Sequence, residues 1–136
     1  MTVVRRLLTV IVALSLSSVG WYYFYGSRRI NSDRAEATVK EIRSAEAAFK
    51  KTNGRYGTLD ELAAAGLIDS SLRGGAKSGY RFHIDAEKES YRATATSTEH
   101  EEHGSWSFYL DESGVVRGRC CQGQADASDP AVRYQE

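Results

Sequence analysis

Two short clusters carry the side chains in this chain that could do chemistry. The first is the run His100-Glu101-Glu102-His103, which brings together imidazole and carboxylate groups of the kind that bind Zn²⁺. It lacks the zinc-protease pattern, in which two histidines stand four residues apart on a helix and Glu directly follows the first. A solvated acidic loop is the favoured interpretation, with His100 and His103 kept as candidate metal ligands.

The second cluster is the adjacent pair Cys120-Cys121. A bond between sequence neighbours closes a strained ring and rarely forms. In an oxidising compartment the alternatives are intermolecular bridges or free thiols. Metal binding by both cysteines together with the two histidines is a further alternative.

No catalytic motif accompanies these clusters. The chain contains no nucleophile elbow, no Gly-x-Gly-x-x-Gly and no phosphate-binding loop. We therefore predict no enzyme activity, no catalytic residue, no cofactor and no small-molecule substrate.

Length and charge restrict the function further. The chain has 136 residues, enough for one small domain, and its 18 basic residues balance its 18 acidic ones. Without a basic excess to neutralise phosphates, we expect no nucleic-acid partner.

The N-terminal region predicts a membrane anchor. The 20 residues from Leu7 to Gly26 carry no charge, and a helix of that length spans roughly 30 Å, the thickness of a bilayer core. The segment before it, residues 1–6, is short and its only charges are positive. This favours a cytoplasmic N-terminus, because positively charged flanking segments tend to stay on the cytoplasmic side. The anchor residues that we expect to face lipid or its interface are Leu7, Ile11, Leu14, Trp21, Tyr22 and Phe24.

A cleavable signal peptide is the alternative for the same region. Arg5 and Arg6 would precede its apolar core, and Ser18-Val19-Gly20 would be a small-x-small cleavage site. The uncut anchor is favoured because the apolar run continues past Gly20. Either interpretation sends residues 27–136 across the membrane, so we predict a bacterial inner-membrane protein with a periplasmic domain.

The residues that follow predict an amphipathic helix over Arg34 to Lys51. Its apolar stripe recurs at spacings of four and three and consists of Ala35, Val39, Ile42, Ala45 and Phe49. The opposite, charged face is assigned Lys40, Glu41, Arg43, Glu46 and Lys50. Glu36 with Lys40, and Glu46 with Lys50, have the i,i+4 spacing that supports a helix.

A short helix and a sheet complete the predicted domain. Thr58-Leu59-Asp60-Glu61 is a capping box that begins a helix running to about Ala65, before Gly66. Alternating patterns then predict three to four antiparallel strands, at Tyr80–Asp85, Tyr91–Thr96, Trp106–Leu110 and Val115–Arg119. The expected fold is α+β, with the anchor leading into a helix that packs on the sheet. Its core should contain Val39, Ile42, Phe49, Leu62, Tyr80, Phe82 and Phe108.

This order of elements, and the residues in it, resemble the type IV pilins and the related pseudopilins. Phe108 to Arg117 is similar to the "F-x-x-D-x-x-G-x-[IV]-R" hairpin of type IVa pilin-like proteins, and Tyr56 stands in their "G-x-Y" sequence before the short helix. The similarity covers roughly the last hundred residues. Its other segments are Gly66–Leu72, Gly74–Phe82, Tyr91–Ala95 and Ala127–Pro130.

The N-terminal residues depart from that family. Pilins carry a leader that ends in Gly, followed by Phe-Thr-Leu-Ile-Glu, whereas here Arg5-Arg6 run directly into Leu7 and no carboxylate lies between Met1 and Ser32. The resemblance therefore implies the pilin fold and a membrane tether, and does not extend to peptidase processing or assembly as a major pilin.

What the resemblance implies about function is a non-catalytic subunit of a type IV pilus or type II secretion-like assembly. Its partners would be the inner membrane and other pilin-like subunits or assembly-platform proteins. The exposed loops Glu99–Gly104 and Cys120–Pro130 would present the surface to them. The alternative is a stand-alone tethered or secreted periplasmic binding module that has the pilin fold but enters no filament.

Overall fold

The computed structural model describes residues 30–98, 105–121 and 123–132. The chain divides into two compact units, residues 1–30 and residues 31–136, and only the second is described below.

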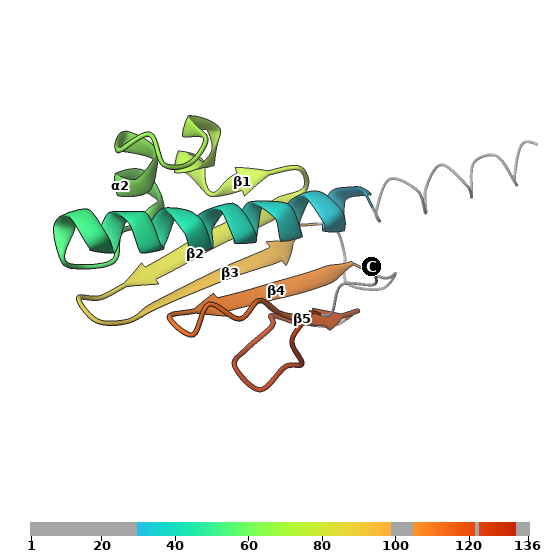
Figure 1. Ribbon diagram of the computed structural model, residues 1–136. Helices are drawn as coiled ribbons and strands as arrows, with labels where there is room; N and C mark the ends of the chain where they lie inside the picture. Colours follow the sequence, from blue (N-terminus) through green and yellow to red (C-terminus); the bar gives the residue numbers. More distant parts are fainter. Residues whose placement is uncertain (1–29, 99–104, 122, 133–136) are drawn as a thin grey trace, which may run out of the picture. The chain divides into compact units, whose positions relative to one another are not determined.

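One long helix, residues 30–53, lies across one face of an antiparallel sheet (Figure 1). Its buried stripe includes Ala35, Val39, Ile42, Ala45 and Phe49, as the spacing predicts. The helix ends where Gly54 adopts a positive φ of 71°, which continues no right-handed helix. The i,i+4 pair Glu36–Lys40 forms at 2.7 Å.

Two short helical segments follow the long helix. The helix α2, Leu59–Ala64, begins with the expected capping box, in which the Thr58 hydroxyl accepts from the Glu61 backbone N–H. The 3₁₀ turn η1, Ser70–Gly74, was not expected from the sequence. Asp69 caps it by accepting a hydrogen bond from the backbone N–H of Ser71.

The sheet has five strands in the order β1-β2-β3-β4-β5, each antiparallel to its neighbour. The strands are β1 (Ala76–Lys77), β2 (Tyr80–Ala86), β3 (Tyr91–Ser97), β4 (Trp106–Asp111) and β5 (Arg117–Cys120). The prediction of three to four strands is therefore corrected to five. The strand that the sequence missed, β1, is two residues long, too short to show an alternating pattern.

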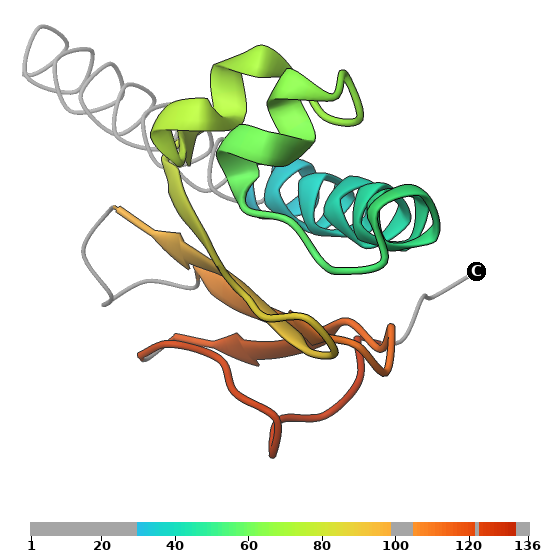
Figure 2. The same cartoon turned by 90° about the vertical axis from the view of Figure 1, so that its left-hand side faces the viewer.

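Alternation along the strands gives the sheet two different faces. The inner face, against the long helix, includes Phe82, Ala95 and Phe108, which are aligned across β2, β3 and β4. Small side chains on the central strand leave room for the helix above them. The outer face carries Arg92, Thr94 and Tyr109, and Figure 2 shows the last part of the chain, in red, on this side of the sheet.

The expected membrane-spanning element is corrected. Within the described ranges, no helix combines the length and the apolar composition needed to cross a bilayer. The long helix carries charged residues such as Glu36 and Lys40 along its solvent side. This finding conflicts with the predicted fold class that begins with an apolar anchor, with the single-pass interpretation and with the assigned inner-membrane location.

The residues to which the sequence assigned the anchor lie outside the described part of the chain. They are residues 7–26, with Leu7, Ile11, Leu14, Trp21, Tyr22 and Phe24 among them.

Candidate functional site

The C-terminal loop, residues 123–132, is fastened to the edge strand β5 by a buried carboxylate. Asp129 is only 6% exposed, and its Oδ1 accepts from Arg119 Nε at 2.8 Å. Its Oδ2 accepts from the backbone N–H of Asp126 at 2.8 Å. Both carboxylate oxygens are therefore hydrogen-bonded, one of them to a cation, which is the arrangement that makes a buried charge tolerable.

A tight turn inside the loop brings its two aspartates together. Asp126 Oδ1 accepts from the Ser128 backbone N–H at 2.8 Å and from its hydroxyl at 2.6 Å. These hydrogen bonds, the side-chain one first, lower the pKa of Asp126. An Asp side chain that accepts from the residue two positions later forms a local turn. This turn prepares the loop for the contact between Arg119 and Asp129, which we call the clasp.

Backbone contacts and one glycine hold the end of the loop beside β5. Gly118 N donates to Pro130 O at 3.1 Å, and Val132 N donates to Val116 O at 2.9 Å. A Cβ on Gly118 would lie 2.8 Å from Val132 Cγ2 and 3.1 Å from the Trp106 ring. Glycine is thus required here for the chain segments to approach each other.

The loop and the outer face of the sheet enclose a groove with a volume of about 410 Å³. We call it the outer groove. The lining residues from strands β3 and β4 carry a guanidinium and two hydroxyls, and those from the loop carry an amide and a carboxylate, so the lining includes donors, acceptors and methyl groups. Its lining residues are Arg92, Thr94, Tyr109, Gln124, Ala125, Asp126 and Ala127.

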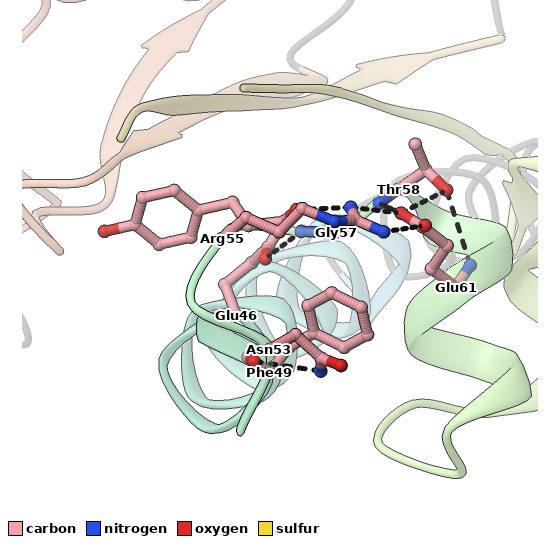
Figure 3. Close-up of polar contacts among 8 residues, drawn as sticks. Glu46, Phe49, Asn53, Arg55, Gly57, Thr58 and Glu61 are labelled. Atoms are coloured by element: carbon pink, nitrogen blue, oxygen red, sulfur yellow. Dashed lines mark hydrogen bonds and ion pairs between the residues drawn. The ribbon is translucent and has the colours of Figure 1, made fainter. Parts of the chain in front are cut away.

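A second buried carboxylate lies at the other end of the domain, where the long helix turns toward α2 (Figure 3). Glu46 is 0% exposed; its Oε2 accepts from the Gly57 backbone N–H at 2.9 Å, and its Oε1 has no hydrogen-bond partner among the described residues. A Cβ on Gly57 would lie 3.0 Å from the Phe49 ring. The absence of a side chain lets this backbone N–H come close enough to the helix to reach Glu46.

Burial dominates the electrostatics of this carboxyl. It raises the pKa of Glu46 to about 7, an effect that the Gly57 hydrogen bond opposes and the nearby charge of Glu61 adds to. Burial, with the charge of Glu46 second, also raises the pKa of Tyr91. A carboxyl with a pKa near 7 has the acidity of a general acid or base, but this one is fully enclosed, so no substrate atom can contact it.

The carboxylate of Glu61, next to Glu46, is in the opposite state. It forms an ion pair with the Arg55 guanidinium and accepts from the Thr58 backbone N–H at 3.0 Å (Figure 3). These hydrogen bonds, that of Arg55 first, lower the pKa of Glu61 to about 2. Glu61 thus completes the capping box and stays ionised.

The sequence placed Glu46 on the charged face of the helix, paired with Lys50, and that assignment is wrong. Lys50 instead pairs with Glu89 at 3.0 Å and lies over the Tyr56 ring. The spacing could have indicated the true position, because Glu46 stands four residues after Ile42 and three before Phe49, on the buried stripe.

The two clusters from the sequence have different outcomes. Cys120 and Cys121 are joined to each other by a disulfide. The adjacency of the two residues in the sequence disfavours this bond, and the expectation drawn from it is wrong. His100 and His103 lie outside the described residues. Among the residues that are described, no three His, Cys, Asp or Glu side chains gather as a metal site would require.

The seven expected core residues are all buried in one cluster, to which the long helix, α2 and the sheet contribute. They are Val39, Ile42, Phe49, Leu62, Tyr80, Phe82 and Phe108. The functional geometry that the sequence did not reveal is the Arg119–Asp129 clasp and the outer groove, because both depend on residues that the fold brings together.

No protein-family model, curated protein or solved structure matches this chain. The resemblance to pilins therefore stays a prediction.

Proposed function

We propose that this chain is a non-catalytic, pilin-like interaction subunit that binds another pilin-like subunit of a type IV pilus or type II secretion-like assembly. The observation that carries the proposal is the C-terminal loop, which Asp129 and Arg119 fasten over the outer face of the sheet. This loop includes most of Cys120–Pro130, one of the two loops that the resemblance assigns to partner contacts; the other, Glu99–Gly104, lies outside the described residues.

A fastened loop is suited to binding because its shape is set before the partner arrives. An interface that must order a flexible loop loses part of its affinity to that ordering. Here the turn at Asp126, the clasp with Arg119 and the backbone bond to Pro130 fix the loop from three sides. Gln124, Ala127 and Pro130 nevertheless remain exposed to a partner.

The outer groove gives that surface a recess. Its volume of about 410 Å³ is enough for a large side chain or a short extended segment of a partner. Arg92 and Asp126 at its walls can orient such a segment through charge, while the exposed Ala127 offers apolar contact.

The long helix provides the rigid base for this surface. Its apolar stripe is buried along the inner face. The segments that carry the resemblance fall on η1, on strands β1 to β3, on the β4–β5 hairpin and on the C-terminal loop. This arrangement supports the pilin-like interpretation.

Site-specific photocrosslinking in the native host tests the proposal. A photoreactive amino acid at Ala127, at the groove, should give a covalent adduct whose second component is a pilin-like subunit by mass spectrometry. The same residue placed at Lys88, in the exposed β2–β3 turn, should give none.

A matched pair of substitutions locates the contact. Ala127→Trp fills the mouth of the groove and should reduce the adduct formed from a crosslinker at Gln124 by about tenfold, a typical loss at an interface centre. Ala64→Trp, on exposed α2, should not change it. Equal adducts from Ala127 and Lys88, or equal effects of both tryptophans, would contradict the proposed surface.

The outer groove also favours a second candidate, a stand-alone binding module for a small polar ligand. A volume of about 410 Å³ lies within the range of small-molecule sites, and mixed donors and acceptors suit an uncharged or zwitterionic ligand. Titration of the isotope-labelled protein with glycine, glutamate and glucose should then give saturable shifts at Thr94 and Tyr109 that Arg92→Ala removes. Absence of saturable shifts with all three probes would count against this candidate.

A further inference from the structure

The disulfide between Cys120 and Cys121 stands at the end of the edge strand β5, where the chain leaves the sheet for the C-terminal loop. These are the only two cysteines of the chain. Cys120 is aligned with Trp106 in the β4–β5 ladder, and Cys121 N donates to Ser105 O at 3.1 Å.

This disulfide connects no separate parts of the structure. A crosslink stabilises a fold mainly by restricting the unfolded chain, and its effect grows with the length of the loop that it closes. Here the two residues have a sequence separation of 1, so the bond encloses no further residue. The attachment of β5 comes instead from the ladder to β4 and from the clasp between Arg119 and Asp129.

Both cysteines are open to reagents in solution. Cys120 and Cys121 are each exposed, unlike the buried cysteines that are typical of a core. Thiol–disulfide exchange requires a thiolate to reach a sulfur atom, so exposure decides whether a disulfide can react in the folded protein.

The backbone at the same place is held in a rarely populated conformation. Cys121 has a φ of 74°, in the left-handed region that residues other than glycine seldom adopt. Such conformations are unfavourable for residues other than glycine and are concentrated at functional and switch positions. An unfavourable backbone conformation beside a disulfide that links no separate elements points to a role in chemistry rather than in stability.

We propose that Cys120–Cys121 is a reversible thiol–disulfide exchange site for an external dithiol. A thiolate of the dithiol attacks one cysteine sulfur, a mixed disulfide forms, and the other cysteine leaves as a thiolate that takes up a proton. The second thiol of the dithiol then attacks the mixed disulfide and loses its proton, and the first cysteine is released as a thiol. Two electrons and two protons pass to the protein, the dithiol becomes a disulfide, and the reverse sequence restores the Cys120–Cys121 bond.

Alkylation of the full-length, folded protein tests this proposal with dithiothreitol as the probe. Protein prepared without reductant should take up no maleimide, and protein treated with dithiothreitol in native buffer should take up one on each cysteine, by intact mass. Replacing the reductant with oxidised glutathione should return uptake to none. The midpoint of thermal unfolding should shift by no more than about 3 °C on reduction, because the bond closes no loop.

Three results would overturn the proposal. Maleimide uptake without reductant would show that the bond is not present in the protein. Uptake that requires denaturant would show that the sulfurs are not accessible. A disulfide-linked dimer that disappears on reduction would show that the cysteines pair between chains.

Single substitutions separate exchange at the pair from simple thiol reactivity. In Cys120→Ser the remaining thiol has no neighbour to displace a bound group, so oxidised glutathione should leave a stable adduct. The reduced wild-type protein under the same treatment should lose the glutathione and re-form its internal bond. A stable glutathione adduct on the wild-type protein would contradict the role of the second cysteine.

Discussion

Glu46 and Asp129 are two buried side-chain carboxyl groups whose hydrogen-bond partners differ. Each fastens a loop to the element beside it: Glu46 holds the segment at Gly57 against the long helix, and Asp129 holds the C-terminal loop against β5. Asp129 has a hydrogen bond to each oxygen, one of them from the Arg119 guanidinium. Glu46 has one backbone donor on Oε2 and no partner on Oε1.

The difference shows what decides the charge of a buried acid. A backbone N–H supplies one hydrogen bond but no full positive charge, so it only partly offsets the desolvation of Glu46, whose pKa remains raised to about 7. A guanidinium supplies charge together with directed hydrogen bonds. We infer that Asp129 stabilises its loop through its contact with the Arg119 guanidinium, whereas Glu46 stabilises its loop best when protonated.

The largest loss of stability from a single substitution is expected from Asp129→Ala. The change removes the acceptor of both the Arg119 side chain and the Asp126 backbone, which then lose their partners at the sheet edge. We expect a loss of about 2 kcal/mol in the free energy of unfolding, less than for a fully buried pair because water can reach Arg119. Urea unfolding followed by circular dichroism measures it.

Glu112→Ala is the matched control for that substitution, because Glu112 is exposed in the β4–β5 turn. It should change the stability by less than about 0.5 kcal/mol. If Asp129→Ala proved equally mild, the clasp would not be what holds the loop.

A pH dependence of stability is expected from Glu46. Its pKa in the folded protein is raised to about 7 from an ordinary value of 4.5, so between these values the folded state binds more protons than the unfolded state. Stability from this group is therefore full at acid pH and is lost as the pH rises through about 7, by about 3 kcal/mol. The free energy of unfolding in urea, measured from pH 4.5 to 8.5, reports the sum over all groups.

Glu46→Gln isolates the part that belongs to this carboxyl. The amide keeps an acceptor for the Gly57 N–H but cannot ionise. The free energy of unfolding of the variant should therefore increase relative to that of the wild-type protein as the pH rises. Glu41→Gln, on the exposed side of the same helix, should run parallel to the wild type. A constant difference between Glu46→Gln and wild type at all pH values would mean that Glu46 does not titrate in this range.

Local patterns in the sequence predict the elements of this fold well. The stripe through Val39 and Ile42, the capping box at Thr58 and the alternation in β2 depend on residues near one another in the chain, and each appears in the structure. Such signals need no knowledge of what packs against the element.

The candidate site could not be predicted in the same way, because its contacts join distant residues. Asp126 and Ser128 indicate a local turn between Arg119 and Asp129, but nothing in the sequence indicates that this turn brings Asp129 back to Arg119. Glu46 was misplaced because a carboxylate on an apolar stripe is normally assigned to solvent, and only the close approach of Gly57 makes its burial tolerable. The strand β1 was not predicted for a simpler reason: two residues are too few to show an alternating pattern.

The smallest effect should come from Glu61→Gln, which tests whether the charge near Glu46 contributes to its raised pKa. Glutamine still completes the capping box with Thr58, so α2 should keep its start. The negative charge that raises the pKa of Glu46 is removed, and the positive charge of Arg55 is no longer neutralised. Both changes favour the ionised form of Glu46, so its pKa should fall by about half a unit.

Carboxyl carbon shifts followed by NMR across the titration measure the change, with Glu87→Gln in the distant β2–β3 turn as control. A pKa of Glu46 that stays the same in Glu61→Gln would assign the whole shift to burial and make the comparison with Asp129 one of hydrogen-bond partners alone.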